Sequence, residues 1–211
     1  MGSSANRRRT GQQGNGSNFS SDRSANFQAV SSANEDLSSQ GEVQRNSLSP
    51  LQENHSFRKR APNQMWHVDF AGPFQLTEQK VYLLVVVDDY SRFALAIELI
   101  PSRETTPVTS ILARLFGQYG TPKEILTDHG TTFASLWTTS THQFSEFCSL
   151  HSVNHKLAAP YYPESNGKVE ALIKTGKREC LNNLLLSSLG IAQLQQELEQ
   201  FREYYNFHRL H

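Results

Sequence analysis

Cysteine is scarce in this sequence, and the two cysteines that occur stand alone. Cys148 and Cys180 belong to no CxxC pair, so we predict neither a disulfide framework nor a zinc knuckle and expect two buried, reduced thiols. Long apolar runs are also missing. The longest, Val81–Val87, has seven residues, whereas a helix that crosses a bilayer needs about 20. We therefore expect a soluble cytoplasmic protein that makes no membrane contact.

An excess of charge of one sign is absent from the whole chain but not from its parts. The 211 residues include 20 basic and 20 acidic side chains. Residues 1–60 have a net charge of +3, contain 13 serines and show no apolar periodicity, which predicts a disordered leader. Residues 61–211 have a net charge of −3 and hold the periodic apolar pattern, which predicts one folded domain.

Strand and helix patterns alternate within residues 61–211. Strand patterns occur at residues 65–70, 81–87, 93–99 and 124–127. Helix patterns occur at residues 105–116, between 138 and 153, from about 166, and at 191–206. The first strand is expected to stop at Gly72-Pro73, and a further short strand is expected between the second and third helices. This order predicts an α/β fold with a mixed sheet flanked by helices.

Three acidic residues stand at the ends of predicted elements. Asp69 lies late in the first strand, Asp128 follows the fourth, and Glu170 lies in the first turns of the third helix. A mixed sheet would bring these ends together, and gathered carboxylates repel one another unless a cation lies between them. Mg²⁺ accepts a few carboxylate oxygens, and two ions about 3.5–4 Å apart can serve both oxygens of a phosphoryl displacement. Ordinary surface carboxylates remain the alternative, because the domain offers many acids.

Basic residues follow the glutamate at helical spacing. Lys174, Lys177 and Arg178 come four, seven and eight positions after Glu170, so a helix places all of them along one side. Such a helix can offer a metal ligand at one end and DNA phosphate contacts along its length. An ordinary amphipathic helix with Glu–Lys pairs explains the spacing equally well. Tyr161 and Tyr162 precede the helix and are candidates for DNA contact or for packing.

Other polar residues are assigned structural roles. Asp88 and Asp89 follow the second strand and are expected to form the turn into the third strand rather than a metal site. His67 shares a strand face with Asp69, and a buried histidine satisfied by hydrogen bonding is favoured over a metal ligand.

Five stretches together resemble a known family. They read WHVDFAGPF, YLLVVVDDYSRFALAIEL, YGTPKEILTDHGTTF, PYYPESNGKVEALIKTGKREC and FREYYNFHRLH. From about Asn63 to His211, the chain resembles the catalytic core of retroviral-type integrases and bacterial insertion-sequence transposases, the DDE recombinases. In this resemblance the three acids of the family match Asp69, Asp128 and Glu170.

The resemblance implies further properties. The fold would be RNase H-like, with about five strands. The family's DNA-contacting lysines match Lys174 and Lys177, and Lys168 is a weaker match. The implied cofactor is Mg²⁺ or Mn²⁺, in two ions, with no nucleotide cofactor. The implied reaction is hydrolysis of a strand at the end of a mobile element, followed by attack of the freed 3′-hydroxyl on target DNA. The implied partners are element-end DNA, target DNA and further copies of the chain, in the nucleoid if the source is bacterial.

Some features depart from the family pattern. The 41 residues between Asp128 and Glu170 exceed the usual spacing, and His129 replaces the asparagine common after the second aspartate. Residues 1–60 show neither helix-turn-helix periodicity nor zinc-ligand pairs. The sequence stops at Leu210-His211, where relatives continue, so a truncated copy is expected. A non-catalytic remnant that binds DNA or another subunit is therefore the alternative function, and a nuclease of the same fold is a third.

Overall fold

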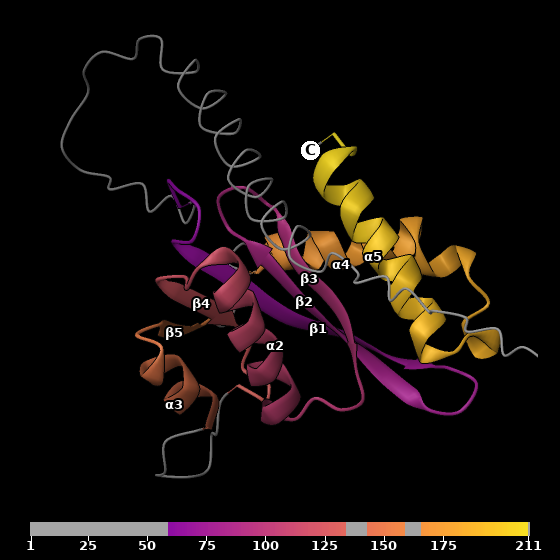
Figure 1. The fold of residues 1–211 in the computed structure, drawn as a ribbon, viewed down its shortest axis with the longest axis horizontal. Coiled ribbons are helices and arrows are strands. Elements are labelled where there is room, and N and C mark those ends of the chain that lie inside the picture. Colours follow the sequence, from indigo (N-terminus) through magenta and orange to yellow (C-terminus); the bar gives the residue numbers. More distant parts are fainter. Residues whose placement is uncertain (1–58, 134–142, 159–165, 211) are drawn as a thin grey trace, which may run out of the picture.

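The computed structural model describes residues 59–133, 143–158 and 166–210 (Figure 1). Its strands are β1 (Met65–Gln75), β2 (Lys80–Asp88), β3 (Ala94–Ile100), β4 (Glu124–Thr127) and β5 (Asn154–Leu157). Its α-helices are α2 (Thr105–Tyr119), α3 (Gln143–Leu150), α4 (Gly167–Glu179) and α5 (Ile191–Phe207). Two 3₁₀ turns, Leu181–Asn183 and Leu186–Ser188, connect α4 to α5.

The five strands form one mixed sheet in the order β3-β2-β1-β4-β5. Strands β1, β2 and β3 form an antiparallel meander, and β4 and β5 add to β1 in parallel. The parallel strands are connected through α2 and α3, as parallel neighbours require. The predicted α/β class, mixed sheet and element order are therefore confirmed, including the short strand between the second and third helices.

The prediction that the first strand ends at Gly72-Pro73 is wrong. Strand β1 continues to Gln75, and its pairing with β2 shifts register between Ala71 and Phe74. This bulge accommodates a proline without a ladder hydrogen bond. Gly72 has a φ of 108°, which side-chain-bearing residues rarely adopt, so glycine is required there. The long β1–β2 hairpin extends past the rest of the sheet (Figure 1).

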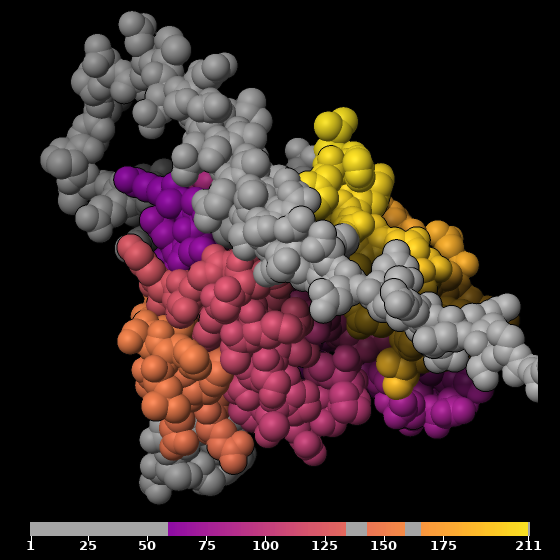
Figure 2. Space-filling model, viewed as in Figure 1, coloured from indigo at the N-terminus to yellow at the C-terminus, as the bar shows by residue number. Residues whose placement is uncertain are grey.

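Alternate residues of the central strands face two separate cores. On one face, Trp66 and Val68 of β1 pack with buried residues of α2 and α3. On the other face, Ala71 of β1 packs with Val169 and Leu172 of α4 and with α5. Figure 2 shows α2 and α3 adjoining on the surface of the first of these faces. The apolar run of β2 is buried on both sides, as predicted for a central strand.

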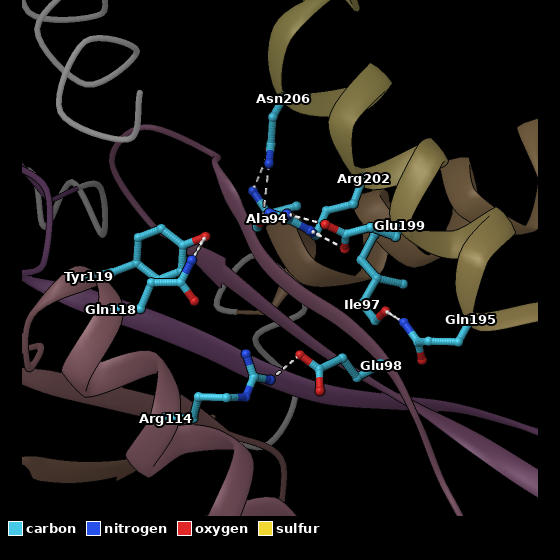
Figure 3. Close-up of polar contacts among 10 residues, drawn as sticks. All are labelled: Ala94, Ile97, Glu98, Arg114, Gln118, Tyr119, Gln195, Glu199, Arg202 and Asn206. Atoms are coloured by element: carbon cyan, nitrogen blue, oxygen red, sulfur yellow. Dashed lines mark hydrogen bonds and ion pairs between the residues drawn. The ribbon is translucent and has the colours of Figure 1, made fainter. Parts of the chain in front are cut away.

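Helix α5 covers the free edge of β3 with side-chain amides. Gln195 accepts a hydrogen bond from the backbone N–H of Leu99 at 2.8 Å. It also donates to the carbonyl of Ile97 at 3.2 Å (Figure 3). Asn206 does the same at Ala94, accepting from its N–H at 2.8 Å and donating to its carbonyl at 3.1 Å. These amides form hydrogen bonds with backbone groups of β3 that a neighbouring strand would otherwise bind.

The described residues also bear on the predictions about the cysteines and about membrane contact. Cys148 and Cys180 are buried free thiols, as predicted. Burial raises the pKa of the Cys148 thiol to about 12. Within the described ranges, none of the helices combines the length and apolar character that a membrane crossing requires. The predicted leader at residues 1–60 lies, up to residue 58, outside the described residues.

Candidate active site

Asp69 lies in the middle of β1, the central strand, and is half-buried. Its Oδ1 accepts a hydrogen bond from the backbone N–H of Phe70 at 2.7 Å. Its Oδ2 accepts one from Nδ2 of Asn166 at 3.2 Å. Asn166 directly precedes α4 and makes no capping hydrogen bond to that helix. The Asp69 carboxylate is therefore tied to the start of the helix that carries Glu170.

Strand pairing brings Asp128 beside Asp69. Strand β4 pairs with β1 in parallel, and the last matched pair is His67 with Leu126. Asp69 and Asp128 each come two residues after a member of that pair, and Asp128 directly follows the end of β4. Because neighbouring strands lie about 4.8 Å apart, Asp128 leaves the sheet beside Asp69, and its negative charge acts on the Asp69 carboxylate.

The turn after β4 holds the Asp128 carboxylate. The backbone N–H of Gly130 donates to its Oδ1 at 2.9 Å. A β-carbon added at Gly130 would lie 2.8 Å from the same oxygen, so this close approach requires glycine. His129 donates from Nε2 to the carbonyl of Ala158 at 2.7 Å, which ties the turn to the end of β5. Histidine in place of the family's asparagine therefore fastens the turn that carries Asp128.

Glu170 completes the set from the first turn of α4. Its side chain is exposed, while its neighbour Val169 is fully buried against the sheet. Burial, together with the negative charges of Asp128 and Glu170, raises the pKa of Asp69 to about 6, against the lowering effect of the hydrogen bonds from Phe70 and Asn166. The charges of Asp128 and Glu170 therefore act on the Asp69 carboxylate, although the three side chains do not converge on one point.

The donor set suits a hard divalent cation. Three carboxylates and the amide of Asn166 offer only oxygen ligands, which Mg²⁺ and Mn²⁺ prefer. Asn166 Oδ1 is buried and has no hydrogen-bond partner, so an acceptor is left beside Asp69. Among the described residues, no three acidic, histidine or cysteine side chains already surround a single point.

The candidate DNA-binding residues separate into two groups. Lys174, Lys177 and Arg178 are exposed on α4, as predicted from their spacing, although Arg178 also contacts Glu179 at 2.6 Å. Lys168 differs, because its ammonium lies 2.6 Å from a carboxylate oxygen of Asp89 and its side chain is only 18% exposed. The candidates Tyr161 and Tyr162 lie outside the described residues.

Asp88 and Asp89 form the expected turn, but their contacts reach further than the sequence suggested. Asp88 accepts hydrogen bonds from the backbone and hydroxyl of Ser91, both at 2.8 Å. Asp89 contacts Nε2 of His67 at 2.7 Å, which agrees with the expectation of a hydrogen-bonded histidine. Sequence reasoning missed the bond from Lys168 to Asp89 and the bond from Asn166 to Asp69. An asparagine directly before a helix reads as a cap, so no local signal identified its role.

Comparisons with known proteins agree with this geometry. Two family models, both described as Integrase core domain, match residues 59–163 and 151–211. Uncharacterized protein K02A2.6 of Caenorhabditis elegans is 39% identical over 120 residues, which cover 56% of this chain and 8% of that protein. The Gag-Pol polyprotein of Avian reticuloendotheliosis virus is 32% identical over 154 residues, which cover 71% of this chain and 12% of that protein. The chain therefore spans only a small part of these relatives.

The fold also has a solved counterpart. A chain in the cryo-EM structure of a simian T-cell lymphotropic virus intasome in complex with PP2A regulatory subunit B56 gamma is similar, with a TM-score of 0.60 and 20% identity, and the match covers 91% of this chain and 70% of that one. This likeness confirms the predicted RNase H-like fold. The two family matches, which together cover residues 59–211, show that the chain belongs to the integrase core domain family, as the sequence predicted.

Proposed function

We propose that this chain is the catalytic core of a DNA integrase or transposase that cleaves and joins DNA strands with a divalent metal. The observation that supports the proposal is that Asp69 on β1 and Asp128 directly after the adjacent strand β4 are neighbours, with the charges of Asp128 and Glu170 both acting on Asp69. Integrase core relatives are polynucleotidyl transferases, and in this proposal the three acids would supply the metal ligands that such chemistry needs.

Each residue of the set has a distinct task in this proposal. A bound divalent cation would polarise the attacking and leaving oxygens of the phosphodiester. The carboxylate oxygens of Asp69, Asp128 and Glu170 would hold two such cations, either Mg²⁺ or Mn²⁺. Asn166 orients Asp69 by its hydrogen bond, and the Gly130 N–H orients Asp128. With a pKa of about 6, Asp69 is ionised at neutral pH, as a ligand must be.

The exposed bases of α4 would bind the DNA backbone. Lys174 and Lys177 lie one and two turns after Glu170. Each can neutralise a phosphate at a distance along the helix from the reacting bond. The substrates would be element-end DNA and target DNA. Self-association is proposed by analogy with the similar viral chain, whose structure is that of an intasome.

Strand transfer by the full chain on branched or pre-nicked DNA, with Mg²⁺ or Mn²⁺, tests the proposal. Asp128→Asn and Glu170→Gln are expected to lower the rate by about 10²–10³-fold or more, as loss of a transition-state contact does. Glu78→Gln, which changes an exposed acid in the β1–β2 turn, is the matched control and should retain the wild-type rate.

Three outcomes would overturn the assignment. Activity that survives Asp128→Asn would show that the acids are not the metal ligands. Absence of metal-dependent activity in the wild-type chain, with DNA binding retained, would leave the non-catalytic alternative. Cleavage without joining would identify a nuclease instead.

A further inference from the structure

Lys168, Asp89 and His67 form a polar cluster beside the candidate active site. Lys168 Nζ lies 2.6 Å from Asp89 Oδ1 and donates to the Asp89 carbonyl at 2.9 Å. The same Oδ1 contacts His67 Nε2 at 2.7 Å, and Oδ2 accepts the backbone N–H of Lys59 at 2.7 Å. Asp89 therefore joins four parts of the chain: the segment before β1, strand β1, the β2–β3 turn and the first turn of α4.

The cluster is buried and charged. Asp89 and His67 are each 2% exposed. Burial alone would raise the pKa of Asp89, but hydrogen bonds from His67, Lys168 and the Lys59 backbone hold it well below its usual range. Asp89 is thus a permanent carboxylate, and the bond from Lys168 is a charge-assisted bond in a site largely shielded from water. Such a bond limits motion far more than an exposed lysine contact does.

Helix geometry connects this bond to Glu170. Successive residues of an α-helix are rotated by about 100°. Val169 is fully buried against the sheet, so Lys168 lies on one flank of the helix and Glu170 on the other. A contact that fixes one flank also fixes the rotation of the helix about its axis, and this rotation determines where the opposite flank lies.

Even a small rotation of α4 is important, because the reaction rate depends strongly on the position of the Glu170 carboxylate. Side-chain tips lie about 6 Å from the helix axis, so a rotation of about 10° moves the Glu170 carboxylate by about 1 Å. A displacement of about 1 Å at a reacting centre can lower a rate by about 10²-fold. Besides the packing of Val169, two polar contacts hold the very start of α4 to the sheet side: Asn166 with Asp69, and Lys168 with Asp89.

We propose that Lys168 is a positioning residue, which through its bond to Asp89 sets the rotation of α4 and thereby the place of Glu170 beside Asp69 and Asp128. This inference rests on the proposed function of the three acids. It assigns Lys168 a role distinct from that of the exposed Lys174 and Lys177. A lysine already held by a buried carboxylate has little freedom to bind a phosphate.

The test compares Lys168→Met with Lys80→Met, an exposed lysine at the start of β2, in the full chain. For Lys168→Met, we expect kcat for strand transfer to fall about 30- to 100-fold, while KM for DNA changes less than about twofold. Isothermal titration with Mn²⁺ alone should show about 10-fold weaker binding, the size of effect seen when a supporting contact of a metal ligand is lost. Lys80→Met should match the wild type in all three quantities.

A second variant separates positioning from folding. Lys168→Arg keeps a cation within reach of Asp89 and should recover Mn²⁺ affinity and most of kcat, even if Lys168→Met is too unstable to purify. A raised KM with an unchanged kcat would overturn the proposal in favour of direct DNA contact. Wild-type values for Lys168→Met, or no recovery in a folded Lys168→Arg, would also overturn it.

The proposed function fails separately from this inference. If Glu170→Gln and Asp128→Asn abolish strand transfer but Lys168→Met behaves as the wild type, only the positioning role is wrong. If the two acid variants retain activity, the catalytic assignment itself is wrong.

Discussion

Replacing Asp69 by asparagine should stabilise the protein when divalent metal is removed. In wild type, the Asp69 carboxylate is half-buried beside two other acids. Asparagine has the same shape and no charge. Its carbonyl can still accept the Phe70 N–H. The new NH₂ can donate to Asn166 Oδ1, which has no partner in the wild-type protein, once the Asn166 amide turns over.

The magnitude follows from the pKa of Asp69. Its pKa rises from 3.8 to about 6, and each unit corresponds to 1.36 kcal/mol, so ionised Asp69 costs the fold about 3 kcal/mol. Partial exposure and screening by salt reduce the figure to about 1–2 kcal/mol. For a domain of this size, each kcal/mol raises Tm by about 2–4 °C, so we expect a gain of about 5 °C.

The raised pKa of Asp69 also predicts how the difference in stability changes with pH. Folded Asp69 binds its proton more tightly than unfolded Asp69, so ionisation costs nothing below about pH 4. The cost appears as pH rises and is complete above the folded pKa of about 6. The Tm of Asp69→Asn should therefore exceed that of wild type increasingly between pH 4 and 6, and by a constant amount above pH 7.

Thermal unfolding in EDTA, followed by circular dichroism, measures this difference. Addition of Mg²⁺ should raise the Tm of wild type more than that of Asp69→Asn, because only wild type keeps the full set of ligands. Glu78→Gln, which removes an exposed acid, should show neither effect. An Asp69→Asn protein that is less stable than wild type at pH 7 in EDTA would refute the reasoning, because it would mean that burial and the neighbouring acids do not disfavour the Asp69 carboxylate.

Three further predictions concern other parts of the molecule. Gly130→Ala should lower strand transfer about 10- to 100-fold with little change in Tm, because its new β-carbon would displace Asp128 Oδ1; a wild-type rate would contradict this. Lys174→Ala should weaken DNA binding and reduce the slope of log K against log[salt] by about 0.9, measured by fluorescence anisotropy, and an unchanged slope would place the lysine away from DNA. Phe144→Ala should lower the free energy of unfolding by about 3–5 kcal/mol in urea, since Phe144 is fully buried and contacts Phe133 edge to face; a loss under 1 kcal/mol would show a core that refills.

Local patterns in the sequence predicted most of the fold. The apolar run of β2 and the helical spacing of apolar residues in α2 and α5 predicted these elements correctly, because the pattern of buried residues is visible in each segment by itself. The end of β1 was predicted wrongly because Gly72-Pro73 ordinarily marks a turn. Here a bulge opposite β2 absorbs both residues, and a bulge depends on the pairing of two strands rather than on either strand alone.

The candidate site, like the fold, could be predicted from the sequence only in part. The sequence placed each acid near the end of a predicted element, and Asp69 proved to lie in the middle of the longer β1. The mutual placement of the acids depends on the parallel register of β1 and β4, which only the folded sheet defines. The bond between Lys168 and Asp89 joins residues 79 positions apart. No periodicity encodes such a pair, so the sequence grouped Lys168 with the exposed bases of its helix.

The cover that α5 provides for β3 sets a lower limit on the size of a working fragment. A fragment that ended at Glu179 would contain Asp69, Asp128 and Glu170, yet it would lose Gln195 and Asn206 and leave the main chain of β3 bare. Bare strands recruit strands from other molecules. We expect such a shortened fragment to precipitate rather than react. Helix α5 is therefore needed for solubility, although it supplies none of the three acids.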